Sequence, residues 1–364
     1  LSTSKASPTI ENNTISGNQI GILCMAFGDC SPEIRLNRIQ DNTQSGIEIN
    51  ALLNDVSGVS TPLISGNQIK GNGRAIYLAA GGDQNNNKIL QPDMRNNVID
   101  GNLTDGIAAI NNGGAWNSAP KILIQSRNNL IIQNNGAAFI LHNKGGEVSG
   151  VLQNDTVAGN GTGVKSIGAN PVIRNTIVWN NQIELDGIPT DLVSYSDIGD
   201  EAYSGINNNL TVDPRFINPA AGNYRLAASS PLVDAGTNLD VTAVDLDGLP
   251  RTKDGNNDGI ADTDMGAYEV QYYVYAGGDV AVNEGDVINL SASVPADPST
   301  YTFLWDFGDG NTSTLQNPII SFPDEGVNRI TLRVTGSGGQ TSTDAATITV
   351  NNVPPVVEAG SDRI

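Results

Sequence analysis

The chain repeats one pattern of apolar and polar positions from its beginning to about residue 205. Each repeat centres on the aliphatic residue of an Asn-x-Ile-like unit, with a polar residue, mostly asparagine, two positions earlier and asparagine three positions later. A second apolar position follows six to eight residues after the centre. The central residues are Ile15, Ile39, Ile69, Ile99, Ile131, Val157, Ile177 and Ile198, spaced by 20 to 32 residues.

Each repeat predicts short strands of period two separated by Asn/Gly turns, and no repeat can bury its apolar residues alone. Stacking successive repeats as coils closes one core and places their asparagines in ladders. Asparagine also tolerates the left-handed backbone at corners. With this pattern the sequence resembles the right-handed parallel β-helix repeat family over residues 8–205, and we assign residues 1–205 to a parallel β-helix. We interpret the asparagines as structural.

Outward positions of such a coil are candidates for ligand binding. Four residues before the centres stand Glu11, Arg35, Ser65, Arg95 and Arg127. The arginines form either a grip for the carboxylates of an acidic polysaccharide or a solvated face that prevents lateral association. A second outward column contains Glu48, Tyr77, Lys165 and Glu184.

Three longer repeats carry insertions at one equivalent place: 50–61, 79–91 and 110–121. The insertions should project along one edge, which would hold Asp55, Asp83 and Trp116, with the single histidine, His142, near the same point of the next repeat. Trp116 is either a platform for a sugar ring or a cover for the edge of its own coil.

The lyases and epimerases of the β-helix architecture that this chain resembles are similar to one another in needing a base, a charge neutraliser and often a cation on one face. If the chain is such an enzyme, the candidate catalytic residues are Arg95, Arg127, Tyr77, Lys165 and His142. General acid–base chemistry requires them to converge on one groove.

Residues 206–272 depart from the repeat. The Asp213-Pro214, Tyr224-Arg225-Leu226, Ser230-Pro231, Asp234-Ala235-Gly236, Arg251 and Gly266-Ala267-Tyr268-Glu269 motifs resemble the choice-of-anchor type segment that follows bacterial β-helices. We expect this segment to cap the open end of the coil.

Within the same segment, oxygen-bearing residues have the spacing of an Asp-rich calcium loop. They are Asp254, Asn256, Asp258, Asp262 and Asp264. Either they bind a structural calcium ion or they form a solvated acidic turn.

From residue 273 to 351 the pattern changes to alternating strands around Trp305-Asp306-Phe307-Gly308-Asp309-Gly310. This motif resembles the PKD family, which implies a seven-strand immunoglobulin-like β-sandwich with the aromatic residues in its core. Residues 352–364 resemble a linker and the first strand of a further PKD-like domain. The predicted fold is therefore all-β, a right-handed parallel β-helix followed by a β-sandwich.

The charge, the apolar stretches and the cysteines of the chain limit which functions and partners we expect. With 39 acidic and 19 basic residues the formal net charge is -20, which disfavours nucleic acid and anionic membranes as partners. No apolar stretch is long enough to span a membrane. Two cysteines, Cys24 and Cys30, are either a disulfide, as in an oxidising compartment, or free thiols.

We therefore predict a secreted, non-enzymatic structural or adhesive protein of the cell surface, matrix or a filament. Its expected partners are polysaccharide, which would contact Trp116, Arg35, Arg95 and Arg127, or other surface proteins, and self-assembly is a further expectation. The alternative is a secreted lyase or epimerase for uronate-containing polysaccharides.

Overall fold

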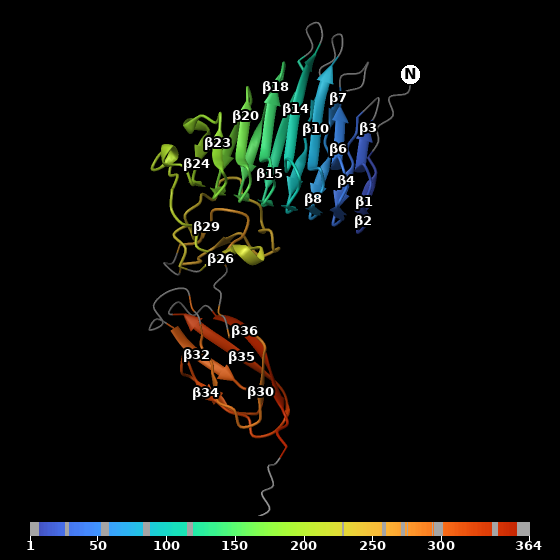
Figure 1. The fold of residues 1–364 in the computed structure, drawn as a ribbon. Coiled ribbons are helices and arrows are strands. Elements are labelled where there is room, and N and C mark those ends of the chain that lie inside the picture. Colours follow the sequence, from blue (N-terminus) through green and yellow to red (C-terminus); the bar gives the residue numbers. More distant parts are fainter. Residues whose placement is uncertain are drawn as a thin grey trace, which may run out of the picture. The chain divides into compact units, whose positions relative to one another are not determined.

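The computed structural model describes residues 7–25, 29–51, 58–82, 88–114, 119–227, 229–256, 260–270, 274, 276–292, 294, 301–336 and 341–354. The chain divides into two compact units, residues 1–253 with 261–271 and residues 254–260 with 272–364. The first unit is a coil of stacked parallel strands with a segment packed on its side, and the second is a separate β-sandwich (Figure 1). The expected all-β fold is confirmed.

Three parallel sheets form the walls of the coil, and we call them sheets A, B and C. Sheet A contains β1 (Thr9–Glu11), β4 (Glu33–Arg35), β8 (Leu63–Ser65), β12 (Asp93–Arg95), β15 (Lys121–Arg127), β18 (Glu147–Gln153), β21 (Asn170–Arg174) and β24 (Val193–Ser194), with β7 (Gly58–Ser60) and β11 (Lys88–Leu90) paired beside them. Sheet B contains β2 (Thr14–Ser16), β5 (Arg38–Gln40), β9 (Gln68–Lys70), β13 (Val98–Asp100), β16 (Leu130–Ile132), β19 (Thr156–Ala158), β22 (Ile177–Trp179) and β25 (Asp197–Ile198). Sheet C contains β3 (Ile20–Met25), β6 (Ser45–Ala51), β10 (Arg74–Gly82), β14 (Ile107–Gly114), β17 (Ala137–Asn143), β20 (Thr162–Ile167) and β23 (Ile183–Asp186).

The register stacks equivalent residues of successive coils, and the interior is filled by aliphatic columns such as Ile39, Ile69 and Ile99, all fully buried. Two asparagine ladders run beside this core. In each step the backbone N–H and the Nδ2–H of one asparagine donate to Oδ1 in the next coil, as from Asn67 to Asn97 at 3.0 Å for both bonds. The predicted ladders are therefore confirmed.

The last coils differ from the expected register by one residue. Val157 pairs with Val178 and not with Ile177, and Thr176 takes the ladder position through its hydroxyl. Asn175 instead occupies the left-handed corner with φ 51°.

The later positions of these coils shift in the same way. Asn181 replaces Asn180 in the second ladder. Leu185 replaces Ile183 in the core, and Asp186 replaces Glu184 in the outward column.

Only the beginning of the segment after the coil sits at the coil end, where we expected the whole segment. Its elements are η3 (Pro219–Ala221), β26 (Phe216–Asn218), β27 (Asn223–Leu226), β28 (Thr252–Lys253) and β29 (Asp262–Thr263), whereas η1 (Thr190–Leu192) and η2 (Glu201–Tyr203) belong to the end of the coil. The end of the coil is covered by Tyr203, whose hydroxyl donates to the Ile188 carbonyl at 2.6 Å, and by Leu210, which bridges to Asp197. Most of the remainder packs on the outer face of sheet B, beside the later coils.

Residues 211–253 and 261–270, which we call the side segment, are held on sheet B by two apolar clusters. Tyr224, Ala267 and Tyr268 pack with Leu130, Ile132 and Ala158 of the coil. Leu226, Leu232, Val233, Met265 and Val270 pack with Ile177. Ile177 is thus buried under the side segment, not inside the coil, which explains the one-residue shift: its neighbour Val178 fills the interior.

The second unit is a sandwich of a five-stranded and a two-stranded sheet within the described residues. The larger sheet contains β30 (Val280–Asn283), β36 (Thr341–Asn351), β35 (Gly326–Gly336), β32 (Tyr301–Asp306) and β33 (Thr312–Ser313), and the smaller one β31 (Ile288–Asn289) and β34 (Ile319–Ile320). Trp305 is fully buried in the core, and its Nε1–H donates to the Leu315 carbonyl at 3.0 Å. The predicted PKD-like first strand at the chain end falls largely on residues 355–364, outside the described residues.

Candidate binding surfaces

The predicted arginines form one column on the outer face of sheet A. The register pairs Glu11 with Arg35, Ser65 with Arg95, and Arg95 with Arg127. Beyond these, the column continues through Gln153 to Arg174, which our shifted register had missed.

Most of these arginines have polar partners within the coil or the side segment. Arg35 pairs with Glu11 at 3.0 Å, and Arg95 is 3.7 Å from Asp93. Arg127 donates from Nη2 to Gln125 Oε1 at 3.0 Å, and Arg174 lies 4.0 Å from Asp240. Arg35 and Arg95 keep nearly half of their side-chain surface exposed, so the column remains open to a ligand that can compete with these surface pairs.

Tyr77, Lys165 and His142 lie on a different sheet, sheet C. Tyr77 and Lys165 share one outward column but are separated by Ala108 and Ile140. His142 pairs with Ile110 and Ile167 in the neighbouring column.

The local partners of these sheet C residues also differ. The Arg74 guanidinium lies 5.0 Å from the centre of the Tyr77 ring, and Lys165 forms a 2.8 Å ion pair with Asp186. The five residues proposed for an enzyme therefore occupy two sheets and do not meet in one place.

The calcium-like loop is only partly described. Asp254 and Asn256 belong to the second unit and have polar partners, whereas Asp262 and Asp264 belong to the first, and Asp258 lies outside the described residues. Asp262 Oδ1 accepts a 2.9 Å bond from Asn238 Nδ2. In the described part of the chain, no three His, Cys, Asp or Glu side chains gather as a metal site.

Asp264 does not fit the ligand role predicted for it. Its side chain is fully buried, and its two carboxylate oxygens accept backbone N–H bonds from Asp234 at 2.8 Å and from Val270 at 2.5 Å. It therefore serves the interior of the side segment, where it fixes two backbone N–H groups.

Asp264 belongs to a buried charge network around Arg251. The Arg251 side chain is fully buried and lies 3.4 Å from Glu269, which accepts the Asp264 N–H at 3.0 Å. Arg251 also donates to Asn128 Oδ1 of the coil at 2.7 Å. Burial raises the pKa of both Asp264 and Glu269, since desolvation disfavours two neighbouring carboxylates.

The Gly-Ala-Tyr-Glu motif explains why this network docks on the coil. Gly266 has φ 94°, and a Cβ there would lie 2.6 Å from Ile177 Cδ1 and 2.8 Å from Thr156 Oγ1. The Gly266 N–H donates to the Asn175 carbonyl at 2.7 Å, and the Ala267 N–H donates to Thr156 Oγ1 at 2.9 Å. The Gly-Ala-Tyr-Glu motif thus fixes the side segment to the coil.

Two other buried carboxyls have raised pKa values. Asp155 occupies an asparagine-ladder position, where it accepts from Asn129 and from the Ser126 hydroxyl, and burial raises its pKa to about 7. Burial likewise raises the pKa of Asp197 to about 7 at the end of the coil, where the carboxylate accepts the Val212 N–H at 3.0 Å. Asp155 thus takes the place of a neutral side chain in its ladder.

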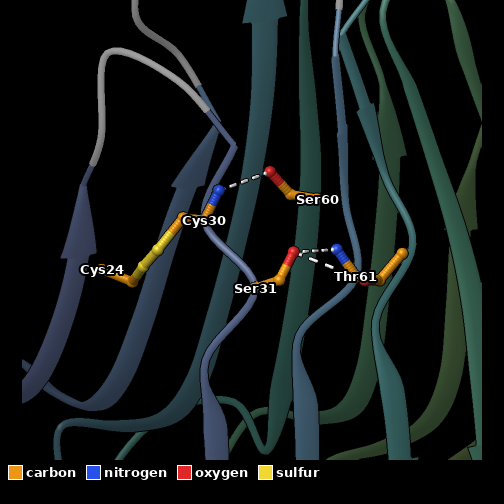
Figure 2. Close-up of a disulfide and its surroundings, with 5 residues drawn as sticks. All are labelled: Cys24, Cys30, Ser31, Ser60 and Thr61. Atoms are coloured by element: carbon orange, nitrogen blue, oxygen red, sulfur yellow. Dashed lines mark hydrogen bonds between the residues drawn. A yellow bond between two sulfur atoms is a disulfide. The ribbon is translucent and has the colours of Figure 1, made fainter. Parts of the chain in front are cut away.

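A disulfide joins Cys24, the penultimate residue of β3, to Cys30 in the following coil, with their Cα atoms 6.4 Å apart (Figure 2). Beside it, the Cys30 N–H donates to the Ser60 hydroxyl at 2.9 Å, and Thr61 bonds to Ser31. The middle of each insertion, with Asp55, Asp83 and Trp116, lies outside the described residues, so the sugar platform at Trp116 stays a prediction.

The fold and these surfaces define a class: a right-handed parallel β-helix joined to a PKD domain. A family model described as "Right handed beta helix region" matches residues 1–119, and one described as "PKD domain" matches residues 272–350. The pair of domains fits a surface or extracellular protein. No helix in the described residues is long and apolar enough to cross a membrane.

Similar proteins share only a short stretch with this chain. It is 37% identical over 71 residues to collagenase ColQ1 of Bacillus cereus, which is 20% of this chain and 7% of that protein. It is 38% identical over 69 residues to a microbial collagenase of Vibrio alginolyticus and 33% identical over 78 residues to the pre-pro-metalloprotease PrtV of Vibrio cholerae, covering 18% and 21% of this chain and 8% of each protein. The chain spans less than a tenth of these relatives, and each match has about the length of a PKD domain.

Proposed function

We propose that the chain is a non-enzymatic structural or adhesive component of an extracellular or cell-surface assembly. The observation that carries this proposal is the pairing of outward charges with one another across adjacent coils. Lys121 pairs with Glu147 at 2.6 Å, Lys165 with Asp186 at 2.8 Å, and Lys70 with Asp100 in the same way. Charged side chains that neutralise one another along the wall of the coil suit a structural role. Catalysis instead requires charged side chains to converge on one substrate.

The interior supports the same role. Its aliphatic columns and two ladders run continuously through the coil, so each coil is fixed by both neighbours. We therefore expect the coil to act as a stiff structural element.

For the adhesive contact, we propose the arginine column of sheet A, with Arg35, Arg95 and Arg127 facing carboxylates of an acidic polysaccharide. Guanidinium groups suit this task because their planar fork matches a carboxylate. A structural calcium ion bound by the Asp-rich loop that begins at Asp254 is a further part of the proposal, as is self-assembly through the lateral faces.

The test incubates the purified chain with a panel of uronate polysaccharides, with and without calcium, and measures binding together with ultraviolet absorbance, which reports the unsaturated product of β-elimination. We expect retention of polysaccharide by the wild type, weaker retention by Arg127→Gln, and a flat absorbance trace. Growth of the absorbance that disappears in Arg127→Ala or His142→Ala would overturn the proposal and establish a lyase.

A further inference from the structure

One face of the PKD domain carries an unusual set of side chains. Along β32, the buried Tyr301, Phe303 and Trp305 alternate with exposed residues, and the neighbouring strands continue this outer side of the larger sheet. We call it the threonine face, after its seven threonines: Thr302, Thr331, Thr335, Thr341, Thr343, Thr347 and Thr349. Thr302, Thr335 and Thr341 form one row across three strands.

The basic residues of the domain gather on the same face. Between residues 272 and 351 the sequence has nine acidic residues and two basic ones, Arg329 and Arg333. Both lie on β35, four residues apart, and point outward, so their Cα atoms are about 13 Å apart along the strand. Both are exposed, and neither has an ion pair within the described part of the chain.

The threonines beside the arginines have hydroxyl groups that mostly make no hydrogen bond among the described residues. Arg333 lies between Leu304 and Thr343 in its row, and Arg329 is paired with Thr347. The Thr302 hydroxyl donates weakly to the Thr335 carbonyl at 3.4 Å, and the other hydroxyls of the face have no hydrogen bond among the described residues.

Two carboxylates lie beside this face, and each accepts a backbone N–H while keeping its negative charge. Asp306, at one end of the face, accepts the Gly308 N–H at 2.9 Å, and Asp279 accepts the Thr347 N–H at 2.7 Å. The centre of the face is therefore rich in donors on an otherwise acidic domain.

We propose that the threonine face is a binding site for an extended acidic polysaccharide, with Arg329 and Arg333 each holding a carboxylate and the threonines bonding to sugar hydroxyls. Guanidinium groups and hydroxyls together form short charge-assisted and neutral bonds to such a chain. The two guanidinium groups complement carboxylates spaced along a polymer, while the surrounding acidic surface repels denser polyanions such as nucleic acid. The inference rests on the adhesive role proposed above but assigns contact to a second domain.

The experiment measures binding of the whole chain to polygalacturonate and to neutral dextran by biolayer interferometry over a range of salt concentrations. We expect Arg329→Gln combined with Arg333→Gln to weaken binding to polygalacturonate about tenfold and to reduce its salt dependence. Thr343→Val with Thr331→Val should give a smaller loss. Arg38→Gln, which removes one exposed charge from the coil, is the control and should bind like the wild type.

The outcomes separate this inference from the proposed function. Loss of binding in Arg127→Gln but not in the PKD double variant overturns the threonine face and leaves the coil site standing. Equal binding of dextran and polygalacturonate also overturns it. If sedimentation velocity shows a dimer that only the double variant abolishes, with polysaccharide binding unchanged, the occupant is a second copy and the inference is wrong. Growth of the ultraviolet absorbance of an elimination product refutes only the non-enzymatic role.

Discussion

Two halves of sheet B have the same backbone and opposite surfaces. In the early coils the outward residues beside the buried isoleucines include Arg38, Gln68 and Lys70, all exposed. In the later coils the same columns hold Val98, Leu130 and Ile132, with Ile177 and Trp179 beyond. The apolar half lies under the side segment, whereas the polar half faces solvent.

The difference shows that a solenoid wall must be interpreted column by column. An apolar residue pointing outward in one coil is unremarkable, but a column that changes from polar to apolar marks where another element packs. The covered half also adjoins the buried charge network, because the side segment brings Arg251 and its carboxylates against Asn128 of the coil.

The largest effect should come from removing the buried arginine. Arg251→Met leaves Glu269 and Asp264 without their cation, and we expect the free energy of unfolding to fall by about 3–5 kcal/mol. Urea unfolding followed by circular dichroism measures it. Arg38→Met, in the open half, should change stability by less than about 0.5 kcal/mol. If both variants lost the same free energy of unfolding, the covered and open halves of sheet B would not differ in their contribution to stability.

A smaller loss of stability should follow from shortening an apolar side chain under the side segment. Leu130→Ala removes a side chain that is 2% exposed and packed against Tyr224 and Tyr268, and should cost about 2–3 kcal/mol in urea unfolding. Gln68→Ala, two coils earlier in the same column, is the matched control and should be near neutral. The comparison fails if Gln68→Ala costs as much as Leu130→Ala.

The smallest effect, measured per pH unit, is a pH dependence of the free energy of unfolding that comes from the covered half. The Asp155 carboxyl keeps its proton up to a pKa of about 7 in the folded chain, whereas in the unfolded chain it loses the proton near pH 4. Its contribution to stability is therefore full below about pH 4 and is lost as the pH rises to about 7, by at most about 1.4 kcal/mol per pH unit. Asp155→Asn should remove that part of the slope in urea unfolding between about pH 4 and 8. Asp240→Asn, at an exposed carboxyl, should leave the slope intact, and an unchanged slope in Asp155→Asn would contradict the prediction.

Much of the coil could be predicted because paired asparagines mark each repeat and fix its register. The prediction slipped where Asn175-Thr176-Ile177-Val178 offered two adjacent aliphatic residues. Threonine can replace asparagine in the ladder through its hydroxyl, so the asparagine was assigned to the wrong column. Counting three residues on from Val178 gives Asn181, a signal that would have corrected the register and brought Arg174 into its column.

The binding surfaces were harder to predict. The sequence identified the arginine column, but not that Arg35 and Arg95 would be paired by Glu11 and Asp93, because such pairs depend on side-chain direction in three dimensions. Spacing alone also placed Asp264 in a calcium loop, although the backbone turns its carboxylate inward to two N–H groups. Linear spacing specifies proximity along the chain, not direction.

The asparagine ladders also give the coil an electrical direction. Every step between two asparagines has its donors aimed toward the next coil and its acceptor toward the previous one, so the amide dipoles add instead of cancelling. The donor end of the second ladder is Asn181, whose backbone N–H and Nδ2–H both donate to the carboxylate of Glu184, at 3.2 and 2.6 Å. Glu184 thus does for a row of side chains what an acidic residue does at the first turn of an α-helix: it places a negative charge at the positive end of an aligned dipole.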